Sequence, residues 1–295
     1  MPPSRQGTLL AIAAFSLWGF FPFYFKLLGE FSTLEVLANR IIWSVFALGL
    51  FITFLRQWRK IQKTLANYHY LRCLLLSTVL IGFNWCTYIW SVASDQIFEA
   101  SLGYYINPLV NVLLGFIFLK ERLRRVQWAA VALAAIGVFL QIINLGSLPW
   151  IALVLGFSFG FYGLIHKNLA LDTMPGLFVE TILLFPLALV FLLISIERDM
   201  GPLNWTGGDW LLLSAAGPVT VIPLLLFTAA AKRITYSSLG FLVYITPSIL
   251  FLLAALVYRE PFNTLMLITF GFIWAALIIF SVDAIRHQRH RKRVE

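Results

Sequence analysis

The sequence predicts an all-α integral membrane protein with ten transmembrane helices. Hydrophobic residues make up 60% of its 295 residues and charged residues only 12%. The apolar residues form runs of about 20, the length that an α-helix needs to cross a hydrocarbon core of ~30 Å. Within that core, each backbone polar group must be paired internally, which leaves helices or closed barrels. Strict alternation of polar and apolar residues is absent, so helices are favoured.

A repeated motif divides the chain into two similar halves. Tyr-Ile-Asn-Pro at residues 105–108 returns as Tyr-Ile-Thr-Pro at residues 244–247. Thirteen positions after each proline stands a glutamate that follows a basic residue, Glu121 in the first copy and Glu260 in the second. Such self-similarity predicts two related structural units. We expect five-helix repeats at 7–143 and 149–284, a cytoplasmic N-terminus at 1–6, and a basic cytoplasmic tail at 285–295.

The ten expected spans follow one another with short connections. The first apolar run begins after Arg5 like a signal peptide, but it continues through Pro22 without a small-residue cleavage site. We therefore expect it to be an uncleaved membrane helix. The longest connections are near 56–69 and 196–208. The spans are expected at residues 7–28, 33–55, 70–93, 98–119, 126–143, 149–166, 176–195, 209–231, 236–257 and 263–284.

The positive charges predict the orientation of the chain. Most of the 22 Lys and Arg residues lie in alternate loops, on the side that also carries both termini. Cytoplasmic loops of membrane proteins are enriched in these residues, so we expect the N-terminus and the C-terminus to be cytoplasmic. The net charge of +9 is explained by these loops, and no nucleic-acid partner is expected.

Five spans per half is an odd number, so the second repeat is expected to cross the membrane in the opposite direction. The charges agree with this expectation. Arg122, Arg124 and Arg125 follow the first motif, whereas the matched positions of the second copy are uncharged. Inverted repeats are typical of secondary transporters, whose substrate sites lie near the membrane midplane between the halves.

Several segments resemble a known family. Residues 100–111, with the sequence ASLGYYINPLVN, residues 80–85 and residues 40–44 are similar to the drug/metabolite transporter superfamily. Within it they resemble the EamA family and its RarD-type permease branch, often labelled "chloramphenicol-sensitive". The resemblance covers almost the whole chain. It implies a multi-pass permease of the bacterial inner membrane, without cofactor or metal, and it implies no particular substrate.

The two motif prolines are the first candidates for a site. A proline inside a helix leaves the carbonyl four residues earlier without its helical donor. Pro108 and Pro247 are therefore expected to free the carbonyls of Tyr104 and Val243. One hypothesis is a pair of polar substrate-binding patches at mirrored depths. The alternative is a packing kink whose polar groups bind neighbouring helices. The residues expected in these patches are Tyr105, Asn107, Tyr244 and Thr246.

Two charged residues, Arg40 and Glu180, lie within the expected spans. Intramembrane charges are costly and usually face the interior of a helix bundle or a wet cavity. Their positions place Arg40 toward the outer side and Glu180 toward the cytoplasm, roughly 12–15 Å apart along the membrane normal. We expect an outer and an inner element of one cavity, with Arg40 binding an anionic group and Glu180 as the proton-coupling candidate. The alternative is that each pairs locally with an Asn, a Tyr or a backbone carbonyl.

Three further residues are expected to bind substrate. Asn84 and Tyr88 lie one turn apart and share a face, although a membrane Asn also often serves only in helix packing. Trp18 is favoured because its neighbour Gly19 allows close approach of another helix. Charged residues at the ends of spans are explained by snorkelling without a function, namely Lys26, Lys167 and Asp283.

Together these features predict a secondary transporter that moves a small organic metabolite or drug-like molecule by alternating access. No Walker motif is present, so any pumping is expected to use a gradient. A passive facilitator of small metabolites such as amino acids is the alternative. A membrane-embedded enzyme ranks third, because no His, Cys or carboxylate cluster converges within a span. The expected partners are a small-molecule substrate and the lipid bilayer, with protons and a homodimer left open.

Overall fold

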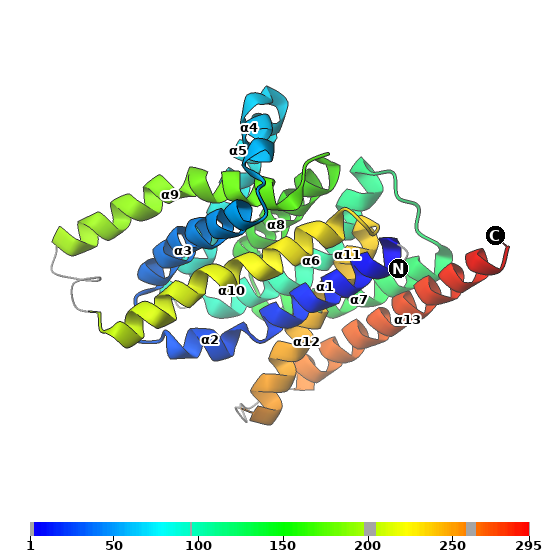
Figure 1. The fold of residues 1–295 in the computed structure, drawn as a ribbon. Coiled ribbons are helices and arrows are strands. Elements are labelled where there is room, and N and C mark those ends of the chain that lie inside the picture. Colours follow the sequence, from blue (N-terminus) through cyan, green and yellow to red (C-terminus); the bar gives the residue numbers. More distant parts are fainter. Residues whose placement is uncertain (1–2, 95, 198–204, 258–263, 295) are drawn as a thin grey trace.

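A computed structural model describes residues 3–94, 96–197, 205–257 and 264–294 of the chain. The described residues form helices and connecting turns, with no strand among them. Figure 1 shows the helices side by side in one bundle. Their bounds are α1 Pro3–Gly19, α2 Phe21–Leu27, α3 Thr33–Phe54, α4 Trp58–Ala66, α5 Tyr68–Ala93, α6 Ile97–Phe118, α7 Arg125–Leu145, α8 Trp150–Asn168, α9 Thr173–Glu197, α10 Gly207–Ala231, α11 Tyr236–Val243, α12 Ile245–Leu252 and α13 Thr264–Val294, with a π-helical turn η2 at Leu253–Val257.

Ten segments are long and apolar enough to cross a membrane, which confirms the predicted fold class. Their bounds agree with the sequence expectation to within a few residues at most ends. The connection expected near 56–69 differs, because it contains the helix α4. Ile61 and Thr64 on one face of α4 are 4% and 1% exposed, and the helix packs against α9 and α5. The motif residues Arg259 and Glu260 lie outside the described residues.

The first and ninth spans are broken, each near its middle. The first is divided into α1 and α2 after Gly19, and Pro22 stands in the first turn of α2. The ninth is divided at Tyr244 into α11 and α12. By contrast, α6 continues through Pro108 as one helix. The two motif prolines, which have the same sequence spacing, therefore have different effects on their helices.

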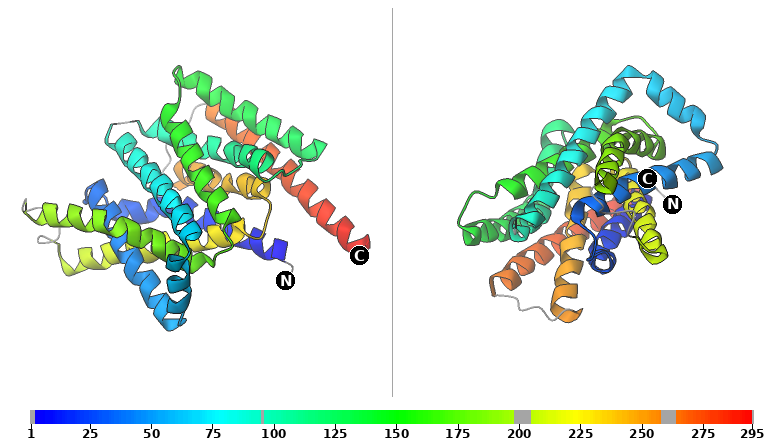
Figure 2. Two further views of the ribbon diagram at one scale, coloured as in Figure 1. Left: turned by 90° about the horizontal axis from the view of Figure 1, so that it is seen from above. Right: turned by 90° about the vertical axis from the view of Figure 1, so that its left-hand side faces the viewer.

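Helices from the two halves pack in reciprocal pairs. The first span packs on the eighth (α1 on α10), and the sixth packs on the third (α8 on α5) (Figure 2). The same exchange relates α6 on α8 to α1 on α12, and α3 on α10 to α5 on α9. Residues at matched positions also meet. The rings of Trp18 and Phe159 lie 5.8 Å apart, and the Tyr244 hydroxyl donates to the Tyr105 carbonyl at 3.2 Å. These reciprocal contacts are the ones that an approximate two-fold relation between the halves would produce.

The N-terminus and the C-terminus lie toward one end of the bundle, here named the terminal end (Figure 1). The turn between α10 and α11 is also at this end. A Cβ placed on Gly7 of α1 would lie 2.6 Å from the Cβ of Arg233, so α1 begins directly against this turn. Gly19, at the other end of α1, approaches α12 closely, because a Cβ there would lie 2.7 Å from Ile249 Cβ. The close approach expected at Gly19 is therefore present.

Replacing Gly217 by alanine is expected to destabilise the fold. A Cβ at Gly217 would lie 2.4 Å from the backbone C and O atoms of Trp43, so α3 and α10 would have to separate. Overpacking of this kind costs about 1–3 kcal/mol. We expect a clear fall in the melting temperature of the purified protein. Gly271→Ala is the matched control, because nothing lies within 4 Å of a Cβ at that position. Equal melting temperatures for the two variants would contradict this packing of α3 on α10.

Candidate substrate-binding site

A cavity of about 490 Å³ lies between the two halves, in the part of the bundle remote from the terminal end. This volume falls within the range of ~300–1,000 Å³ that is typical of small-molecule sites. Helices of both halves contribute to its walls, including α1, α2, α3, α5 and α6 from the first and α8, α10 and α12 from the second. Aromatic and aliphatic side chains form most of the surface, and polar groups are few.

Arg40 supplies the positive charge of the cavity wall. Its Nε donates to the hydroxyl of Thr220 on α10 at 3.0 Å. Its guanidinium carbon lies 5.0 Å from the ring centroid of Trp85 and 5.7 Å from that of Phe25. Among the described residues no carboxylate pairs with it, and its two terminal nitrogens make no hydrogen bond. The guanidinium is thus held by one hydrogen bond and two rings, with donors left for a ligand.

Tyrosines and one amide stand near this cation. The phenol groups of Tyr88 and Tyr104 line the cavity and lie within electrostatic range of Arg40. The amide nitrogen of Asn84 donates to the Leu155 carbonyl at 3.0 Å and to Ser158 Oγ at 2.9 Å. The Asn84 nitrogen therefore joins α5 to α8, which agrees with the alternative that this residue serves in helix packing. Its oxygen accepts no hydrogen bond from the described residues, which leaves one acceptor in the cavity wall.

An aromatic cluster closes the cavity toward the terminal end. Trp18 lies at its centre, with ring centroids 5.6 Å from Phe15, 5.8 Å from Phe159 and 5.7 Å from Phe227. Phe15 and Phe227 are 1% and 0% exposed, so no open path passes between these rings. We name Phe15, Trp18, Phe159 and Phe227 the aromatic floor.

The motif residues serve mainly in packing between helices. Asn107 lines the cavity, but it donates to the Gly156 carbonyl at 2.9 Å and accepts from Asn111 at 3.2 Å. Thr246 also lines it, and its hydroxyl donates to the Phe15 carbonyl at 2.8 Å. Tyr105 contributes its ring to the wall. Tyr244 is not among the lining residues, because it is fully buried in a cluster with residues of α6, α7 and α13. The expectation that it faces the cavity was wrong.

Glu180 also lies outside the cavity, so the expectation that it faces the same cavity as Arg40 was wrong. Its Oε1 is 2.8 Å from Nε2 of His166, and the Tyr162 hydroxyl donates to its Oε2 at 3.4 Å. The His166 and Glu180 side chains are 2% and 4% exposed. Sequence reasoning missed the pair because it ended the span at 166. In the structure α8 continues to Asn168, so His166 lies one turn after Tyr162 and faces α9.

Some residues of the cavity wall were not predicted. Tyr104 is the neighbour of the predicted Tyr105, and Trp85 is the neighbour of the predicted Asn84. The sequence alone did not show which of two adjacent side chains on a helix faces the cavity. Thr220 had a signal of its own, because it lies between Pro218 and Pro223 in the eighth span. Prolines weaken the backbone bonding of a membrane helix, and a hydroxyl between them is a reasonable candidate for an inward-facing group.

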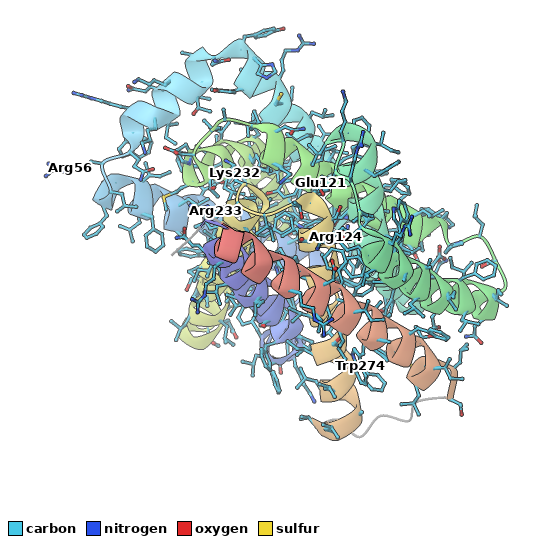
Figure 3. All side chains as sticks on the ribbon, turned by 90° about the vertical axis from the view of Figure 1, so that its right-hand side faces the viewer. Arg56, Glu121, Arg124, Lys232, Arg233 and Trp274 are labelled. Atoms are coloured by element: carbon cyan, nitrogen blue, oxygen red, sulfur yellow. The ribbon has the colours of Figure 1, made fainter. Side chains whose placement is uncertain are left out.

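At the terminal end, two charged side chains hold the turn between α10 and α11 (residues 232–235). The carboxylate of Glu121 accepts from the backbone N–H of Tyr236 at 2.6 Å and of Ser237 at 2.9 Å, and from the Ser237 hydroxyl at 2.7 Å. Lys167 donates to the carbonyls of Ala231 at 3.0 Å and Ile234 at 2.5 Å. We name Glu121 and Lys167 the turn clamp. Figure 3 views this end of the molecule, with Glu121 labelled beside the turn residue Lys232.

Lys167 and Asp283 were expected only to snorkel toward the membrane surface. In the structure both bind other parts of the bundle. Asp283 pairs with Arg124, which joins the start of α7 to α13. The turn itself is held from a further side, because Lys232 donates to the carbonyl of Leu171. Burial lowers the pKa of this lysine, and the nearby Asp172 carboxylate partly offsets the effect.

Ten membrane-spanning helices that enclose a central cavity define a multi-pass membrane permease. The pattern of the EamA-like transporter family matches residues 5–143. An uncharacterized transporter of Vibrio cholerae is 48% identical, over 98% of this chain and 97% of its own. Protein RarD of Escherichia coli is 47% identical, and the chloramphenicol-sensitive protein RarD of Pseudomonas aeruginosa is 30% identical, each over 98% of both chains. The chain belongs to the EamA-like transporter family, together with the proteins named RarD, as its motifs predicted.

Among solved structures, a protein crystal structure shares the fold at low sequence identity. It is 20% identical, covers 96% of this chain and 98% of its own, and superposes with a TM-score of 0.72. The likeness shows that the arrangement of helices is common to distant proteins. It carries no information about the substrate.

Proposed function

We propose that this permease is a secondary transporter that moves small organic molecules across the bacterial inner membrane by alternating access. In this proposal both termini are cytoplasmic, and the halves are inverted repeats at residues 7–143 and 149–284. The cavity between them is the substrate site, with Arg40 as the anchor for an anionic group. The carrying observation is the contrast between the two ends of the cavity: one is exposed, and the other is closed by the aromatic floor and the turn clamp.

Exposure of the wall residues supports this contrast. Tyr88 and Tyr104, near Arg40, are 39% and 40% exposed, whereas Phe15 in the floor is 1% exposed. Below the floor, Tyr162 and Tyr236 are also fully buried. In this proposal these exposures reflect a state that admits substrate from the side opposite the termini, which the orientation proposal assigns to the outer face.

The approximate two-fold axis supplies the second state. If the halves exchange their environments, each contact at the terminal end gains a counterpart at the opposite end. Lys26 stands at the position that matches Lys167, and it is exposed in this structure. Alternation would then exchange a clamped turn at the cytoplasmic end for a clamped turn at the outer end.

The turn clamp is well placed to control the closed end. Glu121 binds the first residues of α11, and α11 continues across the break at Tyr244 into α12. Thr246 and Pro247 at the start of α12 line the cavity. A movement of α11 after release of Glu121 would therefore alter both the terminal end and the cavity wall.

Glu121→Ala is expected to open the terminal end. In a background with Cys73→Ser and Cys86→Ser, we place Ala231→Cys at a fully buried position beside the clamp. Losing a charged acceptor for several donors costs about 1–3 kcal/mol. Because 1.4 kcal/mol is a factor of ten, we expect labelling from the cytoplasmic side by an impermeant maleimide to accelerate about tenfold.

The control is Glu35→Ala, since Glu35 forms a capping box with Ser32 at the opposite end of the bundle. Its removal is expected to leave the labelling rate of Ala231→Cys unchanged. Equal rates in the Glu121→Ala and parent proteins would show that the clamp does not control access. Acceleration from the outer side alone would reverse the proposed orientation.

Proton coupling, proposed for Glu180, now rests on a buried pair rather than on the cavity. Glu180 faces His166 and Tyr162 of α8, and Lys232 at the end of α10 lies within electrostatic range. In this proposal the contact between the Glu180 carboxylate and the His166 imidazole is the place where a coupled proton binds. Because α8 packs on α6 and α10, both cavity walls, a conformational change at the cavity reaches this pair.

Glu180→Gln is expected to abolish substrate-driven proton movement while keeping hydrogen bonds to Tyr162 and His166. The measurement uses proteoliposomes loaded with a pH-sensitive dye and challenged with a panel of organic acids and amino acids, with protein-free liposomes subtracted. Glu99→Gln is the matched control, since Glu99 is a buried carboxylate that accepts from the Ile151 N–H at 2.8 Å. A full proton signal in Glu180→Gln would mean that the pair is structural.

A further inference from the structure

The charges of the cavity wall restrict the class of molecule that it can hold. Arg40 is the charged side chain among the described lining residues, and no Asp, Glu, Lys or His is among them. The rest of the wall offers aromatic rings, aliphatic groups and a few neutral polar atoms. Because the site holds a single cation and no anion, its ligand should carry a complementary charge of one unit.

We infer that the substrate is a small organic acid with one carboxylate, an aromatic or branched apolar body, and no ammonium group. This inference rests on the proposed function, since it assumes that the cavity is the substrate site. It goes beyond that proposal, which leaves the class of substrate open.

The geometry of Arg40 favours one carboxylate. Thr220 occupies Nε, and the rings of Trp85 and Phe25 lie beside the guanidinium carbon. The two terminal nitrogens remain, and their planar arrangement matches the two oxygens of a carboxylate. A dianion such as a phosphate monoester would bring a second charge for which the described wall has no partner. Burial of an unpaired charge is strongly unfavourable.

The same wall disfavours the ammonium group of an amino acid. Asn84 offers one free oxygen, and the prolines free backbone carbonyls at Tyr104 and Val243. Neutral acceptors of this kind can solvate an ammonium but cannot neutralise it, and Arg40 repels it. A zwitterion would therefore give up its hydration without gaining an anionic partner. An uncharged body does not incur this cost.

Aromatic side chains elsewhere in the cavity wall suit an apolar body. The rings of Phe251 and Phe270 are 4.2 Å apart, and Tyr105 lies 5.7 Å from Phe270. The aromatic floor completes the surface below. Ring faces and edges in this arrangement pack well against a flat aromatic or branched aliphatic group. A ligand with its carboxylate at Arg40 and its body among these rings uses both features of the site.

Binding to the purified full-length protein tests the inference with four probes of similar size. The probes are cinnamate, its neutral amide cinnamamide, phenylalanine and phenyl phosphate, and the signal is the heat of binding measured by isothermal titration calorimetry. We expect cinnamate to bind at least tenfold more tightly than each of the others. Equal affinity for cinnamate and cinnamamide would overturn the role of the charge. Tighter binding of phenylalanine or phenyl phosphate would overturn the proposed class.

Arg40→Lys tests whether Arg40 binds the carboxylate of the ligand, because the variant keeps the positive charge at this position but loses the guanidinium. A point charge cannot reproduce the paired hydrogen bonds, so cinnamate should bind about tenfold more weakly while cinnamamide is unaffected. Arg233→Lys is the matched control. Arg233 lies outside the cavity and donates to the Ala229 carbonyl at 2.7 Å, so its replacement should leave both affinities unchanged. Unaltered cinnamate binding in Arg40→Lys would remove Arg40 from the site.

Flux measurements separate failure of this inference from failure of the proposed function. Counterflow of labelled cinnamate and of labelled phenylalanine is measured in proteoliposomes, with protein-free liposomes subtracted. Saturable counterflow of cinnamate, reduced in Arg40→Lys, is expected. Tight binding of cinnamate without counterflow would support the ligand class and contradict transport. Counterflow of phenylalanine without cinnamate would support transport and overturn the ligand class.

Discussion

The cost of leaving polar groups unpaired in a membrane protein is the constraint on which this structure depends. Most buried polar side chains satisfy it within the bundle: Asn107 binds a neighbouring helix, Glu180 binds His166, and Glu121 binds the start of α11. Arg40 departs from this pattern, because it keeps free donors in the cavity wall without a carboxylate partner among the described residues. A group that the fold leaves unsatisfied at such a cost is the best marker of the ligand site.

The sequence predicted the spans well because hydropathy and length decide them directly, and the family motifs agreed. Seven of the residues predicted to bind substrate line the cavity, Arg40 and Trp18 among them, and their role in binding stays a prediction. Its errors concern direction around a helix and the exact helix ends. Tyr244 and Tyr105 occupy matched positions, yet one is buried between helices and the other faces the cavity. His166 was placed at a span end, and one further helical turn was enough to hide its pairing with Glu180.

The two copies of the motif show why sequence symmetry does not give structural symmetry. Pro108 lies in a continuous helix, whereas the chain breaks at Tyr244, three residues before Pro247. If the helices that contain Pro108 and Pro247 had identical conformations and surroundings, both ends of the cavity would be equally open or equally closed. A transporter that exposes one end at a time must place its two copies differently in any one state. The unequal helices are thus expected of a single conformation of a two-fold arrangement.

The spacing within the motif joins the cavity to its closed end. The ten residues of α6 that follow Pro108, up to Phe118, span about 15 Å at 1.5 Å per residue, about half the thickness of a bilayer core. The chain then turns, and the Glu121 N–H donates to the Gly115 carbonyl at 3.0 Å. The helix is continuous from Pro108 to Phe118, and the turn after it brings the Glu121 side chain to the end of α6. A carboxylate at this position reaches the end of the bundle, where it binds α11 of the other half. One motif therefore sets a residue beside the cavity and a residue that holds the opposite half, and these are the two points that the proposed alternating access would have to connect.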